Sequence, residues 1–520
     1  MAPLTRIPQL RTLTGNWYFL PVSVTLLSIL FLLSTGDKLA ESPIFAVSIA
    51  VTIAAVALML IDLRLAVLLF VAFLLAYEEF NLTSEQAFVE ENIKGTVMAV
   101  KIFGFALMDV ISLVLLLPVL LREWSRAVET GRWRWLRADW LLLPLAIVWL
   151  YGMIPGAMNM HSRGDFTWDL RMLLHVLVFY FIFSRTFTTR RDYLYALIVA
   201  GAVFLAKHAV FFFRYLTGGG LHTGSYHRVL LGSDLPLTAL ALALTVAALL
   251  LFRRSRHEHR HGSQMQHWAL LALAAYFSVM LIAGLGKLSY LQAAYSLIMI
   301  FLLHLREIHY RTVAAVIAFG FVASLVVFFT VLPAEGRDTI LYALSSAFNW
   351  WDALKLYGDL SFGTRFLEIV NVWAVLMRDN AVLWGLGWGA AWREIAISMP
   401  WDGGAFGAEE QFEGVHIQTH IDALTFMLKV GVAGMLVIYA SILRFWITAL
   451  RMYHRQHSTW EKWVLMALML MIIIFAPNYL YFIRLKYLLG FALAGVAVFA
   501  GTDDAYPTTH TGLPDSHNAQ

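Results

Sequence analysis

Apolar runs long enough to cross a lipid bilayer recur along the whole chain, and no other feature restricts the fold as much. A membrane-crossing α-helix needs about 20 mainly apolar residues. Only helices and closed barrels satisfy their own backbone polar groups inside lipid. With 60% hydrophobic and 14% charged residues, the 520-residue chain carries more apolar surface than a soluble core can bury. We therefore expect an all-α, polytopic transmembrane helical bundle.

The apolar runs predict about 14 spans (12–14). Helices 1–11 of this set belong to residues 1–332, and helices 12–14 belong to residues 421–500. The polar tail 501–520 has the composition of a disordered cytoplasmic segment. The predicted spans are 17–35, 44–61, 64–80, 102–121, 140–156, 170–187, 193–216, 235–252, 268–284, 288–304, 312–332, 421–443, 463–482 and 485–500.

Positive charge in the short connections predicts the orientation. Five of these segments hold 18 Lys and Arg, and all five fall on one side of the predicted topology. The positive-inside rule makes that side cytoplasmic. We expect a multi-pass membrane protein with both termini in the cytoplasm. The five segments are 122–139, 185–192, 253–267, 304–311 and 444–462.

Charge and cysteine content exclude several classes of function. The net charge of +4 is too small to indicate a nucleic-acid partner. The chain has no cysteine, so structural disulfides, thiolate catalysis and Cys-based zinc sites are excluded.

One connection is much longer than the others. Residues 333–420 hold 5 Lys and Arg against 11 Asp and Glu, are rich in Trp and Gly, and contain a predicted helix at 361–379. Long loops cross the membrane largely regardless of charge. A loop of this length within a polytopic protein usually has a function. We expect 333–420 to be a large, partly helical external loop with a functional role.

Several cations are expected near the same outer surface. Arg228 lies in a short loop, Lys287 lies in a tight turn, and Arg365 begins the loop helix. Arg214 shares a helix face with Lys207, two turns earlier in the seventh span. An ionisable residue inside a span is a functional hypothesis by default. Together these side chains would form an electropositive pocket suited to a diphosphate, because guanidinium groups bind phosphate oxygens in pairs.

These cations also have simpler interpretations. Arg228 could be an interfacial anchor whose charged end reaches the headgroups. Arg365 could pair with Glu368 on its own helix. Lys429, inside the twelfth span, shares a face with Asp422 and could pair with a carboxylate.

A pair of histidines, His416 and His420, closes the long loop at the start of the twelfth span. Two histidines at i and i+4 on a helix can bind zinc. Here Ile417 stands where a metalloprotease has its glutamate, and a third ligand would have to come from 409–413. We favour no metal and no cofactor, with His420 as a general base near neutral pH. We expect three other loop histidines to be solvated: His161, His222 and His227.

The arrangement resembles the O-antigen ligase and O-antigen polymerase superfamily of membrane glycosyltransferases over roughly residues 200–440. SFGTRFLEIVNVWAVLMRDNAVLWGLGWG resembles the loop pattern of that family, with its Gly-Thr-Arg start and Gly-x-Gly turn. HIDALTFMLKVGVAGML resembles its final motif, a histidine followed by apolar positions and two glycines. AGLGKLSYLQAAY resembles a tight turn that usually carries Ser-Arg.

The resemblance implies roles for these residues. His420 would be the catalytic base, Arg365 with Arg228 or Arg214 would bind the lipid diphosphate, and Lys287 would replace the turn arginine. His416 and Lys207 are assigned to the surroundings of the base or to the acceptor side.

The resemblance implies a protein of a bacterial inner membrane, with 333–420 as a large periplasmic loop that carries active-site residues. The implied activity is metal-independent, inverting transfer of a glycan from undecaprenyl diphosphate to a hydroxyl of a glycan, lipid or protein. A polymerase, slightly favoured over a ligase, could also have a chain-length regulator as a partner. A transporter or flippase and an envelope scaffold remain the alternatives. Transporters usually show internal repeats and polar residues at mid-membrane depth.

Overall fold

The computed structural model describes residues 62–76, 101–102, 105–216, 221–223, 226–228, 234–254, 263–284, 287–304, 360–397, 415–416, 419, 421–477 and 483–503. Within these ranges the chain is mostly helical, and three sheets of two short strands each are the other regular elements. The prediction of an all-α chain is confirmed. The spans predicted at 17–35, 44–61 and 312–332 lie outside the described ranges, as does most of the tail 501–520.

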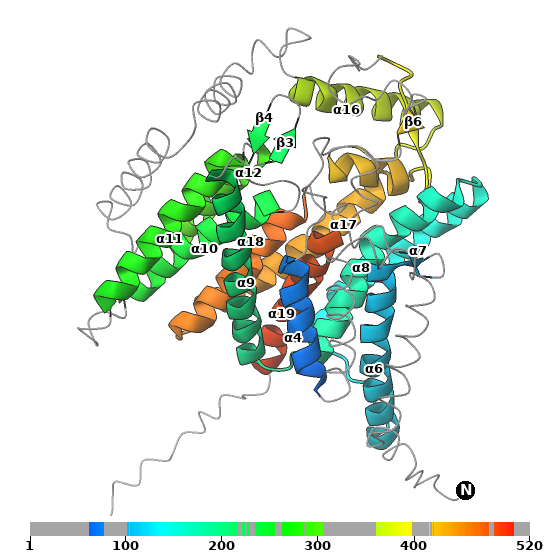
Figure 1. Ribbon diagram of the computed structural model, residues 1–520. Helices are drawn as coiled ribbons and strands as arrows, with labels where there is room; N and C mark the ends of the chain where they lie inside the picture. The colour runs from blue at the N-terminus through cyan, green and yellow to red at the C-terminus, as the bar shows by residue number, and fades with distance from the viewer. Residues whose placement is uncertain are drawn as a thin grey trace, which may run out of the picture.

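Twelve α-helices and one 3₁₀ helix make up the described part of the chain (Figure 1). The helix predicted at 361–379 is present as α16. The helices are α4 (Leu63–Ala76), α6 (Leu107–Thr130), η2 (Arg137–Leu141), α7 (Leu143–Met158), α8 (Arg163–Thr186), α9 (Arg190–Leu216), α10 (Asp234–Arg254), α11 (Ser263–Ala283), α12 (Lys287–Leu303), α16 (Leu360–Arg378), α17 (Asp422–Arg455), α18 (Thr459–Phe475) and α19 (Ile483–Asp503). The paired strands are β1 (Lys101–Ile102) with β2 (Phe105–Ala106), β3 (Leu221–Thr223) with β4 (Tyr226–Arg228), and β5 (Trp392–Arg393) with β6 (Val415–His416), all antiparallel.

Seven stretches in the described part of the chain are long and apolar enough to cross a membrane. Their length and composition agree with the prediction of a membrane protein, because each supplies at least 18 residues of mainly apolar helix. They are Ala138–Met158, Arg163–Thr186, Arg190–Phe213, Asp234–Leu251, Met265–Ala283, Asp422–Arg455 and Arg484–Gly501.

Helix α19 forms the centre of the bundle and packs against α8, α17 and α18. From Leu488 to Ala500 its residues are apolar or small on all sides, which is the pattern of an enclosed helix. Gly490 allows close approach to α8, because a Cβ there would lie 2.9 Å from the carbonyl oxygen of Val176. Gly495 does the same toward Leu468 of α18. A second group of helices forms around α10, which packs against α11, α12 and α18.

Ion pairs join several basic segments at the end of the bundle opposite α16 (Figure 1). Arg185 contacts Asp139 at 2.5 Å and donates to the carbonyl of Arg134 at 3.0 Å. Arg190 contacts Glu461 at 3.0 Å. The segments around residues 134–139, 185–190 and 461 therefore meet at the same end.

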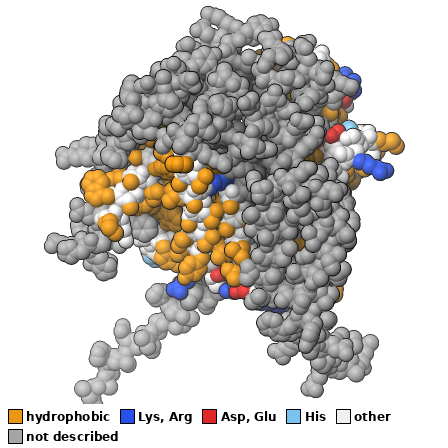
Figure 2. All heavy atoms as spheres, in the orientation of Figure 1, with side chains coloured by type: hydrophobic (Ala, Val, Ile, Leu, Met, Phe, Trp, Pro, Cys, Tyr) orange, Lys and Arg blue, Asp and Glu red, His pale blue; other side chains and the backbone are white. Residues whose placement is uncertain are grey.

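The surface over α9 and α11 is broadly apolar. Figure 2 shows a continuous field of hydrophobic side chains on this side, with charged groups near its edge. Ile198 and Phe213 of α9 and Trp268 of α11 are all more than half exposed. Such a surface is too large for a soluble monomer and suits contact with lipid.

Candidate functional site

Helix α17 is broken at Gly431, near the end of the bundle that carries α16 (Figure 1). The glycine has φ 72° and ψ 177°, so the helix stops at Val430 and begins again at Val432. Two helical hydrogen bonds are lost at the break, those from the N–H groups of residues 432 and 433 to the carbonyls of residues 428 and 429. Unpaired backbone groups at this depth would cost several kcal/mol each.

The loop after α16 supplies replacements for both lost bonds. The N–H groups of Leu386 and Gly387 donate to the carbonyls of Leu428 and Lys429 at 2.9 and 2.7 Å. On the other side of the break, the N–H groups of Val432 and Ala433 donate at 2.9 and 3.2 Å, to the carbonyls of residues 382 and 383 respectively. Residues 382–387 thus fill the gap in the helix, and loop and helix form one backbone unit.

Glycine is required where the two backbones meet. Gly385, Gly387 and Gly431 all have positive φ, at 75°, 90° and 72°. A Cβ at Gly431 would collide with the carbonyl of Leu383, and one at Gly385 would collide with the backbone of Lys429. The sequence WGLGWG is therefore built for close approach to a broken helix.

Trp388 anchors this loop to α7. Its side chain is fully buried, and the indole N–H donates to the carbonyl of Trp149 at 2.8 Å. Its backbone N–H donates to the carbonyl of Gly152 at 2.9 Å. A Cβ at Gly152 would lie 2.5 Å from the indole nitrogen, so the glycine makes room for the ring.

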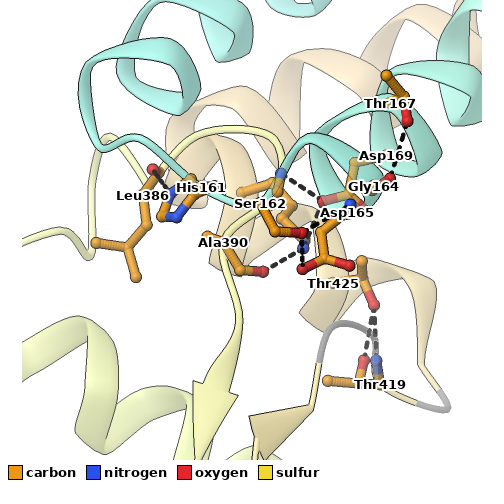
Figure 3. Close-up of polar contacts among 12 residues, drawn as sticks. His161, Ser162, Gly164, Asp165, Thr167, Asp169, Leu386, Ala390, Thr419 and Thr425 are labelled. Carbon is orange, nitrogen blue, oxygen red and sulfur yellow. Dashed lines mark hydrogen bonds and ion pairs between the residues drawn. The ribbon is translucent and has the colours of Figure 1, made fainter.

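A buried ion pair fixes the end of the same loop. Lys429 contacts Asp169 of α8 at 2.5 Å, and both side chains are fully buried. The Asp169 carboxylate also accepts the N–H of Gly389 at 2.7 Å, while the Lys429 ammonium donates to the carbonyl of Ala390 (Figure 3). The side chains of Asp169 and Lys429 therefore hold the backbone of two consecutive loop residues, Gly389 and Ala390. The ion-pair partner of Lys429 is Asp169, which lies on another helix. The carboxylate that shares a helix face with Lys429 in the sequence is Asp422.

A second group of buried charges lies where α10 and α19 begin. Asp234, the first residue of α10, contacts Lys207 at 2.9 Å and Arg484 at 2.6 Å. All three residues are 8% exposed or less. Lys207, predicted near the site, thus belongs to a three-residue network. Beside it, His208 contacts the hydroxyl of Thr238 at 2.8 Å.

Lys486 places a further cation on the first turns of α19. Its side chain is 1% exposed, and its ammonium lies 6.0 Å from the centre of the Trp168 ring. Arg484 and Lys486 are two positions apart in α19 and so stand on different sides of the helix, with Arg484 against Asp234 and Lys486 near Trp168 of α8.

His416 is buried beside the loop, in a strand. It lies in β6, stacks on Trp392 of β5 with ring centres 4.3 Å apart, and contacts Glu394 at 2.9 Å. The sequence placed His416 one helical turn before His420. That placement is wrong for His416, because β5 pairs with its backbone and α17 begins only at Asp422. The helical geometry that a zinc pair would require is therefore missing at His416.

His420 itself lies outside the described residues, but its two neighbours are held at the start of α17. Thr419 donates its hydroxyl to the carbonyl of Ile421 at 2.7 Å. Its N–H donates to the hydroxyl of Thr425 at 3.1 Å (Figure 3). His161, expected to be solvated, instead contacts the carbonyl of Leu386 at 3.1 Å and supports the loop that fills the helix break.

The other predicted cations lie on elements at the same end of the bundle (Figure 1). Arg365 is partly buried in the first turns of α16. For three of them the structure describes the backbone and not the side chain: Arg214 in the last turn of α9, Arg228 in β4 and Lys287 at the start of α12.

The sequence reasoning missed Asp169, Asp234, Arg484 and Lys486. Each is an ionisable residue inside a predicted span or at its edge, which is a signal in itself. An anion site is built from cations, so a predicted diphosphate site gives no signal for the carboxylates of Asp169 and Asp234. Their actual role is to hold buried cations in place.

Comparison with known proteins adds no relative to this description: no protein-family model matches the chain, and no curated protein sequence matches it.

Proposed function

We propose that this protein is a glycosyltransferase of the bacterial inner membrane that acts on the periplasmic face. In this proposal it moves a glycan from undecaprenyl diphosphate to an acceptor hydroxyl, as an O-antigen or exopolysaccharide polymerase or an O-antigen ligase would. The observation that carries the proposal is the group of buried cations, Lys207, Arg484 and Lys486, at one end of the bundle.

Burying charge in a membrane protein is costly, so a surplus of buried cations calls for an explanation. Lys207 and Arg484 both contact the carboxylate of Asp234, so these three groups together carry a net positive charge. Helices α10 and α19 begin beside these cations, and the N-terminal end of a helix favours an anion. The negative charge of a diphosphate at the membrane surface would be stabilised by these cations and helix N-termini. A polyprenyl diphosphate places such a group there, because its lipid tail stays in the bilayer.

The proposed reaction needs a base and a stabilised leaving group. The acceptor hydroxyl oxygen attacks the anomeric carbon of the donor and forms the new glycosidic bond. The bond from that carbon to the diphosphate oxygen breaks, and undecaprenyl diphosphate leaves with the electron pair. His420 takes the hydroxyl proton, while Arg365 and the neighbouring cations stabilise the charge on the diphosphate. Attack opposite to the leaving group inverts the anomeric centre.

The position of the basic segments supports the proposed orientation. Those that meet around Arg185 and Arg190 lie at the end opposite α16. The positive-inside rule would put that end in the cytoplasm and the cation group in the periplasmic half of the membrane.

Transport remains the alternative, and the break in α17 bears on it. In many transporters the unwound backbone of a broken helix coordinates the transported ion. Here the carbonyls of Leu428 and Lys429 accept from Leu386 and Gly387 instead. The backbone groups at the break bind the loop 382–387, and this pairing favours a fixed site over a transport path.

The proposal is tested in cells that depend on this protein for a surface glycan. His420→Ala and Arg365→Ala should abolish polymer or ligated product and cause the lipid-linked intermediate to accumulate. Matched controls are His457→Ala and Arg451→Ala, exposed positions near the opposite end of α17, which should leave product normal. Normal product from both site variants, at normal protein levels, would refute the mechanism.

A further inference from the structure

The exposed face of α16 has the wrong character for contact with water. From Arg365 to Met377, every side chain that is largely exposed is apolar. Four residues form this surface at helical spacing, and we call them the α16 stripe. They are Phe366, Ile369, Trp373 and Met377, exposed by 52%, 43%, 45% and 56%.

The buried face of α16 carries the polar groups. Glu368 is 2% exposed and Asn371 is fully buried. The amide of Asn371 donates to the carbonyl of Ile397 at 2.8 Å and accepts the N–H of Ala396 at 2.9 Å. A helix in water normally turns its polar face outward, whereas α16 buries its polar face and exposes its apolar one. The surroundings of the stripe must therefore be apolar.

The stripe leads into a surface that has the character of a lipid-facing span. Just after α16, Leu383 and Trp384 are 51% and 58% exposed. The hydroxyl of Tyr151 on α7 donates to the carbonyl of Trp384 at 2.9 Å, and their rings lie 6.4 Å apart. On the same helix, Ile154 and Met158 are 61% and 75% exposed. An apolar surface thus continues from α7 through Trp384 to α16.

We propose that the α16 stripe docks on the lipid surface of the membrane that the bundle crosses. Helix α16 lies across the end of the bundle (Figure 1), as an interfacial helix would. Tryptophan and tyrosine favour the headgroup level, and Trp373, Trp384 and Tyr151 supply both. Arg365 and Arg378 border the stripe in sequence, one before Phe366 and one after Met377.

Docking would fix the depth of the candidate site. The opposite face of α16 packs Val372 and Leu376 into a cluster with Trp392, Leu424 and Leu428. The loop that fills the break in α17 is therefore attached to a helix resting on lipid. This inference does not depend on the proposed activity, because it concerns only what covers the stripe.

Spin labels can test the docking, since the chain has no cysteine and each introduced thiol is unique. The full chain is labelled at Ile369→Cys, Trp373→Cys or Met377→Cys in vesicles of phosphatidylethanolamine and phosphatidylglycerol. Collisions with oxygen, which partitions into lipid, are compared with collisions with a water-soluble nickel chelate. Ile154→Cys on α7 is the lipid control, and Arg393→Cys, an exposed residue of β5, is the water control.

We expect oxygen-to-nickel collision ratios at the three stripe positions that are close to the ratio at position 154 and several-fold above that at position 393. Ratios equal to that at position 393 would place the stripe in water and overturn the proposal. Low collision rates with both reagents would show a protein cover and also overturn it. Line broadening that disappears on dilution with unlabelled protein would instead identify a second copy. The labels at 369 and 377 decide the outcome if the tryptophan variant does not fold.

Discussion

Removing the buried ammonium of Lys429 should destabilise the protein strongly, and the contacts of that group determine how strongly. Lys429→Met leaves the carboxylate of Asp169 buried without its counter-ion and the carbonyl of Ala390 without a donor. Breaking a buried ion pair from one side costs about 3–5 kcal/mol. We expect a loss of that size in the free energy of unfolding.

The double variant Asp169→Asn with Lys429→Met should lose less than Lys429→Met alone. Asparagine keeps an acceptor for the N–H of Gly389, and neither charge of the pair remains. The remaining cost is mainly the unsatisfied carbonyl of Ala390, about 1–3 kcal/mol. The two substitutions should therefore couple by more than about 1 kcal/mol.

The assay is reversible unfolding of the purified protein in mixed detergent micelles of increasing SDS content. The four proteins of the cycle are the wild type, the two single variants and the double variant. Arg163→Ala, at an exposed position in the first turn of α8, is the surface control and should change stability by less than about 0.5 kcal/mol. Additive losses in the cycle would refute the claim that Asp169 and Lys429 act as one pair.

Three further substitutions test the architecture of the site by the same unfolding assay. Gly431→Ala should cost at least about 1–2 kcal/mol, because alanine is strained at φ 72° and its Cβ collides with a loop carbonyl; no loss would mean that α17 is unbroken. Trp388→Ala should cost about 3–5 kcal/mol by leaving a cavity against α7, and a loss below about 1 kcal/mol would contradict the anchoring role. Asp234→Asn should cost about 3–5 kcal/mol and more than Lys207→Met, because this carboxylate serves two buried cations; the reverse order would contradict the network.

The sequence predicts the helices well because each depends on a local pattern. The helix expected at 361–379 appears as α16, and the spans expected at 193–216 and 235–252 appear as α9 and α10. The length and apolar content of a helix are properties of one segment, so they can be recognised in the sequence without knowing which segments pack against it.

The break in α17 could not be predicted in this way. Gly431 sits in an apolar run whose helical pattern continues on both sides. Glycine within such a run lowers helix propensity but does not by itself end a helix. The break exists because residues 382–387, more than forty positions earlier, supply the missing hydrogen bonds. Backbone pairing between distant segments leaves no periodic signal in a single sequence.

The candidate site was predicted in part, for the same reason. Lys207 was identified because a cation inside a span is unusual, and it does lie among buried charges. The sequence predicted that Lys429 could pair with a carboxylate, but it could show only groups on the same helix face, such as Asp422. The true partner, Asp169, comes from α8 through tertiary packing. The predicted role of His420 stays a prediction.

The most direct test of the proposed function is glycan transfer by the purified protein in lipid nanodiscs. The wild-type protein receives an undecaprenyl-diphosphate-linked glycan in the presence of EDTA, and the released undecaprenyl diphosphate and the extended or transferred glycan are quantified. The proposal predicts both products in equal amounts from the wild type, none from His420→Ala, and wild-type amounts from His457→Ala. Intact donor recovered from the wild type with its cognate acceptor present, or equal product from His420→Ala, would contradict the proposal.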